Sequence, residues 1–365
     1  MKNSLKFGAV AATAALALAA CGAAPDAQSG DAKSSGDQSA STSGGGNIKA
    51  CMVSDSGGFE DKSFNQSGKE GMERAKEELG VEVSYSESRS ESEFAQNIDA
   101  QLQGGCDLII GVGFLMADAM DEAAVANPDV KFALVDSTFA SESENSKALT
   151  FNTAEASYLA GYAAAGQTST GKVGTFLGAN IPTTAVFADG FADGIAKYNE
   201  VHGTSVTLLG WDKEKQEGMA TGDFEDVSKG KQFSTQLIEQ GADIIMPVAG
   251  PVGAGTLATA TEKGNVSVVW VDADGYVTQP ESGSVILTSV MKQIGNSVFD
   301  TVKSLKEGEW SHDPYVGTLA NEGVGIAPFH DFDAKVSDEL KKEVSDLQTQ
   351  IADGTIKVES KNSPK

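Results

Sequence analysis

The stretch IKACMVSDSGGFEDKSFNQSGKEGM, residues 48–72, joins an apolar run to a polar loop with two adjacent glycines and then to a helical pattern. The helical pattern covers 63–79, where Phe64, Met72 and Leu79 fall roughly on one face. This order predicts a buried strand, a loop at its carboxyl end and a helix that packs back on the strand.

The same unit recurs along the chain, which predicts an α/β fold. Because the strand runs are continuously apolar and alternate with helices, they predict parallel sheets covered by helices on both faces. The body from Ile48 to about Val358 is too long for a single core, so we expect two doubly wound lobes. Strands are expected at 48–55, 81–88, 107–113, 131–137, 148–152, 172–178, 205–211, 242–250, 266–275 and 284–290. Helices are expected at 63–79, 91–103, 155–166, 184–200, 229–240, 253–263 and 292–307.

The N-terminal residues have the pattern of a secretory signal. Lys2 and Lys6 precede an apolar run that is too short to span a membrane, and Leu-Ala-Ala-Cys at 18–21 resembles a bacterial lipobox. In such signals the peptide is cut before the cysteine, whose thiol then carries the lipid. We therefore expect a signal peptide at 1–20 and lipidation, with palmitate as an acyl group, at Cys21. The alternative is an ordinary signal peptide that happens to contain a cysteine.

The segment after Cys21 is composed almost entirely of Gly, Ser, Ala, Asp and Gln. Because it lacks large apolar residues it cannot bury a core, so residues 21–47 are expected to be a disordered tether. The whole chain has a formal net charge of −25. This charge argues against nucleic acid as a partner and against a basic patch for anionic lipid, which leaves the lipid as the only membrane attachment.

The other two cysteines, Cys51 and Cys106, lie in apolar strand-like runs. They could form a disulfide in an extracytoplasmic compartment, or they could be two buried thiols. The spacing of cysteines and histidines does not suggest a metal site. We expect no metal and no cofactor.

Polar and aromatic residues follow the strands, where a doubly wound sheet binds its ligand. Two such edges that face each other would form a cleft. Carboxylates there suit sugar hydroxyls or ring N–H groups, and aromatic rings suit a flat ligand face. Together they predict a ligand with a polyhydroxylated part and an aromatic ring, such as a nucleoside. For single residues, helix capping and core packing are the alternatives. The candidates are Asp55, Asp61, Asp136, Asp272, Asp274, Phe59, Phe64, Phe114, Phe224 and Lys292.

Two other kinds of site fit the sequence less well. A phosphate loop needs GxxxxGK[ST] or GxGxxG before a helix, and VAGPVGAGT at 248–256 has no following lysine. His202, His312 and His330 do not follow a strand in a candidate loop, and no nucleophile stands beside a base at a suggestive spacing. We therefore expect no catalytic residues and no enzyme.

Several motifs occur together in the order of a known family. VSDSGGFEDKSFNQSGKEGM, DLIIGVGFLMADA, NTAEASYLAGYAAA, GDFEDVSKGKQFSTQLIEQGADIIMPVAGPVGAGTLATA, WVDADGY and ILTSVMK resemble the basic membrane protein family of lipoproteins. These are substrate-binding components of ABC transporters for purine nucleosides. The resemblance implies a type I periplasmic binding protein fold with three crossovers. It places 48–153 with 276–318 in the first lobe, 154–275 with 319–358 in the second, and leaves 359–365 as a tail.

The resemblance also implies a site and a role. The purine would lie between Phe224 and either Phe59 or Phe64. Base-edge contacts carry over to Asp61, Asn65 and Asp136, and ribose contacts to Gly250, Asp272 or Asp274, and Lys292.

The role implied is that of a monomeric, lipid-anchored receptor on the extracytoplasmic face of the cell membrane. It would capture a nucleoside by hinge closure and deliver it to an ABC transporter permease. The rivals are a binding protein for a sugar or sugar-derived signal, a surface sensor or adhesin without a transporter, and a nucleoside hydrolase.

Overall fold

The structure, a computed structural model, describes residues 47–141 and 143–364, which belong to one compact unit. The expected signal peptide at 1–20, the lipidated Cys21 and nearly all of the expected tether lie outside the described residues. Within the described ranges, no helix combines the length and the apolar character that crossing a bilayer requires.

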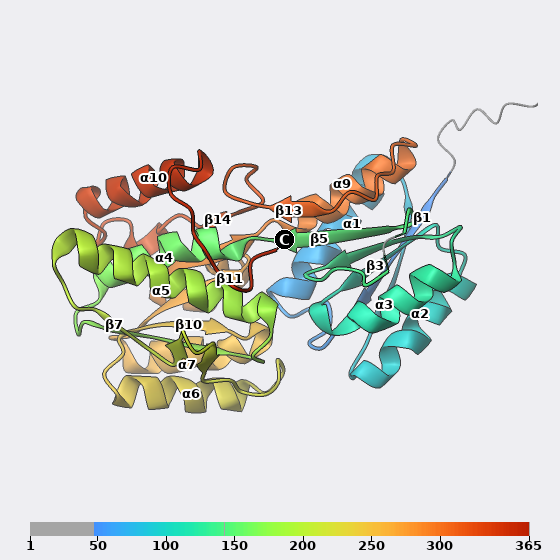
Figure 1. Cartoon of the computed structure of the whole chain (residues 1–365). Helices are drawn as coiled ribbons and strands as arrows, with labels where there is room; N and C mark the ends of the chain where they lie inside the picture. The colour runs from blue at the N-terminus through green and yellow to red at the C-terminus, as the bar shows by residue number, and fades with distance from the viewer. Residues whose placement is uncertain (1–46, 142, 365) are drawn as a thin grey trace, which may run out of the picture. The chain divides into compact units, whose positions relative to one another are not determined.

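Two six-stranded sheets organise the fold (Figure 1). All neighbouring strands of the first sheet are parallel. The second is parallel except for one antiparallel edge strand. The first sheet has the order β13 (Tyr315–Gly317), β5 (Ser146–Phe151), β4 (Lys131–Val135), β3 (Leu108–Val112), β1 (Lys49–Ser54) and β2 (Glu82–Glu87). The second has the order β14 (Val324–Ile326), β12 (Ile286–Lys292), β11 (Ser267–Asp272), β10 (Ile244–Val248), β6 (Lys172–Leu177) and β7 (Thr207–Leu209).

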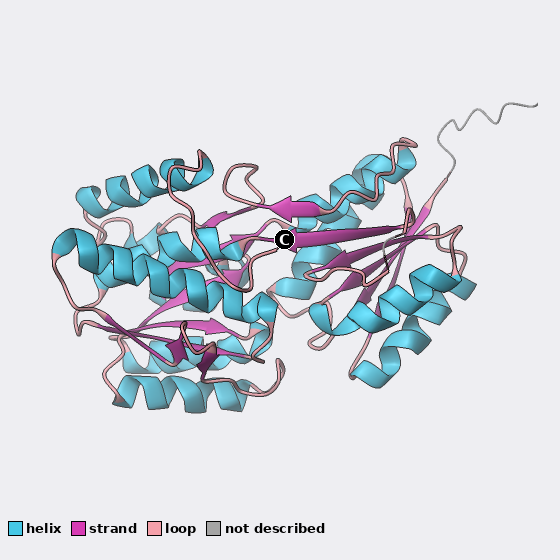
Figure 2. Ribbon diagram, in the orientation of Figure 1, coloured by secondary structure: helices cyan, strands magenta, loops and turns pink. Residues whose placement is uncertain are grey.

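Helices lie on both faces of each sheet (Figure 2). In the first lobe they are α1 (Phe64–Leu79), α2 (Phe94–Gln103), α3 (Ala117–Ala126) and α9 (Ile294–Lys306). In the second they are α4 (Thr153–Gln167), α5 (Pro182–His202), α6 (Val227–Glu239), α7 (Ala254–Lys263), α8 (Gly275–Thr278) and α10 (Asp338–Ala352). The predicted α/β class with parallel sheets flanked by helices is confirmed. A small hairpin of β8 (Trp211–Asp212) and β9 (Glu217–Gly218) adjoins the second lobe.

The burial of β1 explains why its sequence is apolar without alternation. Ala50 and Met52 belong to the core that includes α1, whereas Cys51 and Val53 belong to a separate core under α2 and α3. Successive side chains of a strand point to opposite faces, so a sheet covered on both sides buries every residue. The polar residues that follow β1 are therefore the first ones that leave the core.

The chain passes between the two sheets three times, after β5, after β12 and between β13 and β14. The second passage differs from the expected position at residue 276, because residues 286–292 form β12 beside β11 in the second sheet. The first lobe resumes only with α9, where Arg74 of α1 bonds to Asn296 and stacks on Phe299. A buried strand pattern does not reveal which of two sheets the strand joins, so sequence alone misplaces this boundary.

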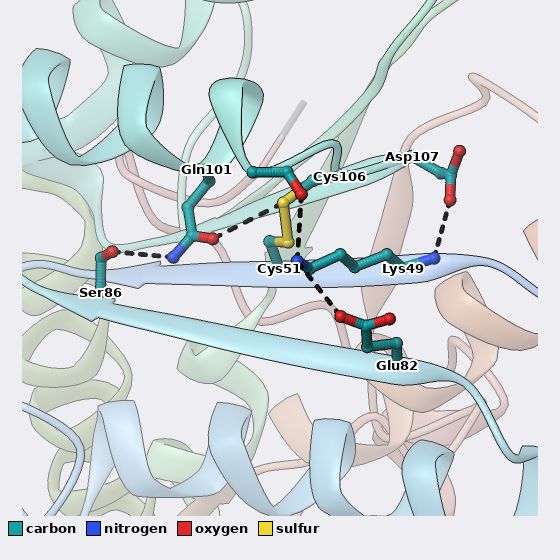
Figure 3. The surroundings of a disulfide bond; sticks show 8 residues. Lys49, Cys51, Glu82, Ser86, Gln101, Cys106 and Asp107 are labelled. Atoms are coloured by element: carbon teal, nitrogen blue, oxygen red, sulfur yellow. Dashed lines mark hydrogen bonds and ion pairs between the residues drawn. A yellow bond between two sulfur atoms is a disulfide. The ribbon is translucent and has the colours of Figure 1, made fainter. Parts of the chain in front are cut away.

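Cys51 and Cys106 form a disulfide with a Cα–Cα distance of 6.0 Å. It joins the middle of β1 to Cys106, two residues before β3 begins. Gln101 of α2 lies beside it (Figure 3). The open alternative between a bridge and two thiols is thereby resolved in favour of the bridge.

Candidate functional site

Side chains at the carboxyl ends of both sheets line one cavity. Asp55 and Asp136 directly follow β1 and β4, while Asp272 and Lys292 are the last residues of β11 and β12. Parallel strands bring their carboxyl ends to one edge, so these residues meet although they are far apart in sequence. The predicted residues found in the cavity are Asp55, Asp61, Phe64, Asn65, Phe114, Asp136, Phe224, Gly250, Asp272 and Lys292.

Two predicted residues lie elsewhere. Phe59 is only 2% exposed and packs edge-on against Tyr85, with 5.4 Å between ring centroids. Asp274 caps α8 by accepting a hydrogen bond from the backbone N–H of Tyr276, and it contacts His330 at 2.8 Å. Of the two pairs of alternatives, Phe64 and Asp272 line the cavity, whereas Phe59 and Asp274 do not.

Lys292 is the cationic side chain of this cavity, and its amino group is almost fully buried. Nζ donates a hydrogen bond to Asp136 across the lobes and lies 3.6 Å from Oδ1 of Asp272. Burial works to lower the pKa of Lys292, but the two carboxylates outweigh it and raise the pKa above its ordinary value. The rings of Phe64 and Phe187 lie 5.0 and 4.9 Å from Nζ, in cation–π range.

Asp61 holds the start of α1. Its carboxylate accepts hydrogen bonds from the backbone N–H groups of Ser63, Asn65 and Gln66 at 2.8–3.0 Å. A carboxylate at a helix N-terminus satisfies donors that have no partner within the helix. Burial nevertheless raises the pKa of Asp61 to about 6, against the opposing effect of those N–H groups. The predicted alternative of helix capping thus holds for Asp61 together with its place in the cavity wall.

Asn65 supplies an acceptor that has no partner. Its Nδ2 donates to Oδ1 of Asp55 at 3.2 Å and to the carbonyl of Ser56 at 3.1 Å. Its Oδ1 is buried and has no hydrogen-bond partner among the described residues. An unpaired buried acceptor costs free energy unless a ligand donor completes it. The side chain lines the cavity, so this oxygen is available to an N–H or O–H group there.

Asp55, directly after β1, is a half-buried acid of the cavity wall. Burial raises the pKa of Asp55 to about 8, and the neighbouring Asp61 and Asp136 add to the rise while Asn65 opposes it. Gly113, at the end of β3, lies against this carboxyl group, and any Cβ at that position would overlap it. The position of Asp55 therefore requires a glycine at 113, the second glycine of the GVGF sequence.

Phe224 enters the cavity from the loop that precedes α6. A Cβ at Gly178 would overlap its ring, so a glycine after β6 is what allows the ring to lie there. Phe64, from α1, lies in the wall contributed by the first lobe. The cavity thus receives one aromatic side chain from each lobe.

Sequence reasoning missed several wall residues. Phe187, Thr183 and Thr184 come from the first turns of α5, and Pro251 from the turn after β10. The signal that could have found the α5 residues is their position just after the strand at 172–177, because they open the next helix at the same edge.

The lobes contact each other around the cavity. Oγ of Ser63 donates to Oδ2 of Asp272 at 2.9 Å, and the backbone N–H of Gly57 donates to Oε1 of Glu225 at 3.3 Å. Within the part of the chain that the structure describes, no group of His, Cys, Asp and Glu side chains is arranged to hold a metal ion. The polar groups of the site can accept and donate hydrogen bonds to a small neutral molecule.

Residues 48–362 match the family described as "ABC transporter substrate-binding protein PnrA-like", abbreviated Bmp. The chain belongs to the Bmp family. It is 31% identical over 332 residues to "ABC transporter nucleoside-binding protein BmpA" of Lactococcus lactis, covering 86% of this chain and 90% of that protein. It is 30% identical over 318 residues to "Basic membrane protein A" of Borreliella burgdorferi, covering 86% and 88%.

The solved structure of an ABC transporter system solute-binding protein from Aeropyrum pernix superposes with a TM-score of 0.77. It is 26% identical and covers 85% of this chain and 92% of that chain. The predicted resemblance to the basic membrane protein family is confirmed. As a Bmp-family member the chain is a substrate-binding protein of the ABC transporter type, and not an enzyme.

Proposed function

We propose that this Bmp-family protein is a lipid-anchored receptor on the extracytoplasmic face of the cell membrane. It captures a nucleoside, with a purine base preferred, and delivers it to an ABC transporter permease as a monomer. The observation that carries the proposal is the cavity between the lobes, which combines Phe64 and Phe224 with a set of buried hydrogen-bonding groups.

The aromatic residues support a flat ring as one part of the ligand. Phe64 and Phe224 belong to different lobes, so a base that contacts both rings draws the lobes together. Aromatic stacking on a nucleobase is worth about 1–3 kcal/mol per base. A simple sugar has no aromatic ring to stack on the two phenylalanines, which is why we place the sugar alternative second.

The polar groups support a neutral ligand rich in donors. Asn65 Oδ1 and the carboxyl group of Asp55 are acceptors for the N–H groups of a base. Asp136 and Asp272 can accept ribose hydroxyls, and Lys292 can donate to a hydroxyl or ring oxygen. Because Lys292 faces several acids, the site disfavours the charge of a nucleotide phosphate.

Ligand capture by lobe closure requires that the ligand binds the closed arrangement better than the open one. The contacts Ser63–Asp272, Gly57–Glu225 and Lys292–Asp136 join the two lobes. A nucleoside bound between the lobes adds contacts that only the closed arrangement can make. Hinge movement at the crossovers is the physical change that a permease would detect.

The location rests on the lipobox-like sequence that ends at Cys21 and on the Cys51–Cys106 disulfide. Disulfides persist mainly in oxidising compartments outside the cytoplasm. Radiolabelled palmitate incorporated in a bacterial host should label the full chain and not the Cys21→Ala variant. Label retained in that variant would overturn the anchor.

The binding test is calorimetric titration of the chain from Gly22 with adenosine, inosine, guanosine, cytidine, ribose and adenosine monophosphate. We expect micromolar or tighter binding of purine nucleosides and at least tenfold weaker binding of ribose and the monophosphate. Phe224→Ala and Asp272→Ala should abolish binding. Phe64→Leu should weaken it, whereas the matched variant Phe59→Leu, outside the cavity, should not. Binding of ribose alone, or of no compound tested, would falsify the nucleoside assignment.

A further inference from the structure

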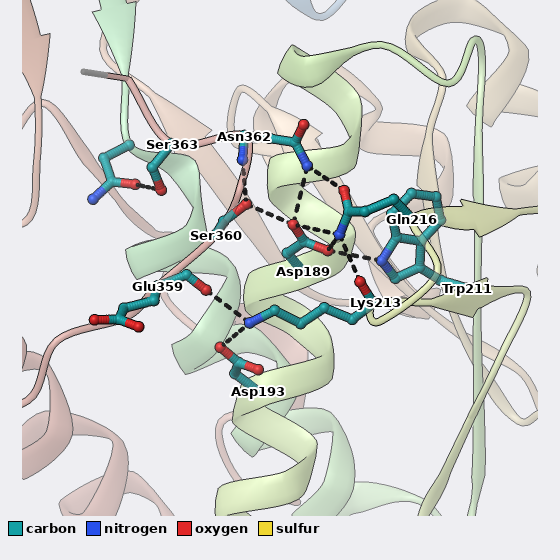
Figure 4. A network of polar contacts seen from close by, with 10 residues as sticks. Asp189, Asp193, Trp211, Lys213, Gln216, Glu359, Ser360, Asn362 and Ser363 are labelled. Carbon is teal, nitrogen blue, oxygen red and sulfur yellow. Dashed lines mark hydrogen bonds and ion pairs between the residues drawn. The ribbon is translucent and has the colours of Figure 1, made fainter.

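Residues 359–364, expected to be a tail, run across the second lobe and are held there by a network of polar contacts (Figure 4). Lys213 donates from Nζ to the carbonyl of Glu359 at 2.7 Å and to Oδ2 of Asp193 at 2.6 Å. This first contact fixes the entry of the segment beside α5.

Asp189 of α5 is the centre of the network. It is fully buried, and its carboxylate accepts hydrogen bonds from Nε1 of Trp211 and Nε2 of Gln216 on the side of the β8–β9 hairpin. From the tail it accepts hydrogen bonds from Ser360 Oγ and Asn362 Nδ2. Asn362 Nδ2 also donates to Oε1 of Gln216 at 2.6 Å. A buried carboxylate is stable only when its oxygens are satisfied, so this arrangement specifies one position for the tail.

Beyond this anchor the segment reaches the first crossover between the lobes. Ser363 Oγ donates to Oδ1 of Asn152 at 2.9 Å, and Asn152 is the residue between β5 of the first sheet and α4 of the second. The backbone N–H of Asn152 donates to the carbonyl of Gly317, at the end of β13. The tail is thus bonded to a residue that links two of the three passages between the lobes.

The same segment forms part of a cavity wall beside the ligand cavity. Asn362 and Pro364 line a pocket together with Ser137 and Thr138 of the first lobe and Val186 of the second. The residues shared by this pocket and the ligand cavity are Phe114, Asp136 and Thr183. The tail therefore lines a pocket that adjoins the ligand cavity next to the crossovers.

We propose that residues 359–364 act as a strap, anchored on Asp189 of the second lobe and bonded to Asn152 at the first crossover, that restrains lobe opening and covers the crossover side of the ligand cavity. Opening of a two-lobed protein needs changes in backbone angles at a few crossover residues. A strap fixed to one lobe and hydrogen-bonded to such a residue opposes that change. The part of the proposal that concerns ligand release rests on the proposed function.

The test measures lobe separation without ligand. Spin labels are placed at Arg89→Cys in the first lobe and Lys231→Cys in the second, both exposed, in a Cys21→Ala background. Cys51 and Cys106 are occupied by their disulfide. Double electron–electron resonance then compares the parent with a variant that ends at Val358. The parent should show a single short distance, and the shortened variant should gain a longer distance population.

Point variants separate the strap from a general loss of folding. Ser363→Ala removes the hydrogen bond to Asn152 and leaves the Asp189 anchor, so it should show part of the same opening. Lys361→Ala is the matched control, because Lys361 Nζ donates to the carbonyl of Glu214 in the second lobe at 3.3 Å, and it should resemble the parent. Equal distance distributions in the parent and the shortened variant would overturn the strap.

The effect on release is measured by stopped-flow dissociation of adenosine. The shortened variant should release it about three- to tenfold faster, which corresponds to the loss of a hydrogen bond of ordinary strength. If the shortened variant opens more but releases adenosine at the parent rate, the tail restrains opening but does not cover the ligand cavity. If adenosine does not bind at all, the proposed function fails, and the resonance distances still decide the strap.

Discussion

Asp136 and Asp272 hold equivalent positions in the two lobes, and both approach the amino group of Lys292. Each lies at the carboxyl end of the third strand in its sheet order, β4 and β11. Both have left-handed backbone conformations, with φ of 61° and 69°. Such angles are uncommon outside glycine and tend to occur at functional sites. One carboxylate from each lobe thus approaches Lys292, and both residues have the same left-handed backbone conformation.

Replacing Lys292 with methionine should destabilise the protein and abolish nucleoside binding. The change leaves Asp136 and Asp272 buried without their cation, a loss that costs about 3–5 kcal/mol for a buried pair. Urea denaturation at pH 7 measures the stability, and titration with a purine nucleoside measures the binding.

Lys69→Met is the matched control, because Lys69 pairs with the exposed Glu60 at the surface. Exposed pairs contribute about 0–1 kcal/mol, so this variant should differ little from the parent. Equal stability losses for the two variants would contradict a buried pair at Lys292.

The raised pKa of Asp55 should make the free protein less stable as pH rises from 4 to 8. Its pKa is about 8 in the folded protein and 3.8 as an ordinary aspartate, so the folded state holds the extra proton between those values. The contribution of this proton to the free energy of unfolding is fully present below pH 3.8. It falls as pH rises above 3.8 and is lost once pH passes 8. A single proton gives a slope of about 1.4 kcal/mol per pH unit. Asp61, with a folded pKa of about 6, adds in the same direction.

Denaturation curves at several pH values should show this slope reduced in Asp55→Asn, because asparagine cannot titrate. Asp99→Asn, an exposed position on α2, controls for the loss of one negative charge. If Asp55→Asn and the parent have parallel stability profiles between pH 5 and 8, Asp55 does not hold a proton in the folded state.

Gly178→Ala should weaken nucleoside binding although Gly178 is not among the wall residues of the cavity. The new Cβ would overlap the ring of Phe224, which must then move. We expect at least a tenfold loss of affinity with a folded protein, since the ring can turn toward the open cavity. Gly325→Ala, where a Cβ meets open space, is the control. Unchanged affinity for Gly178→Ala would mean that Phe224 does not contact the ligand.

The strand-end residues could be predicted from sequence because a parallel sheet places all its carboxyl ends at one edge. Asp55, Asp136, Asp272 and Lys292 were predicted by this rule alone and do share one cavity. The two-sided burial of strands such as β1 likewise follows from their unbroken apolar sequence. These are consequences of local periodicity, which a single sequence records directly.

The choice between Phe59 and Phe64 could not be made in this way. Glu87, at the end of β2, accepts a hydrogen bond from the backbone N–H of Phe59, and the preceding Gly57 and Gly58 have positive φ. These contacts turn Phe59 into the core and leave Phe64 to open α1 at the cavity. The contact with Glu87 is tertiary, so local patterns do not contain it. The pairing of β12 with β11 is also a tertiary contact, so local patterns could not show that the passage between the lobes comes after β12.

Removing the Cys51–Cys106 disulfide should lower stability and leave nucleoside affinity unchanged. The bond closes a loop with a sequence separation of 55 residues, and such links typically stabilise by about 2–4 kcal/mol through the unfolded chain. Cys51 lies mid-strand in a core under α2 and α3, away from the carboxyl edge that carries the site. The Cys51→Ala/Cys106→Ala double variant should therefore unfold at lower urea concentration and still bind adenosine as the parent does. Reduction of the parent with dithiothreitol should give the same shift, while the double variant should not respond to it. If the double variant loses binding free energy for adenosine by as much as it loses free energy of unfolding, the core around Cys51 is instead coupled to the ligand cavity.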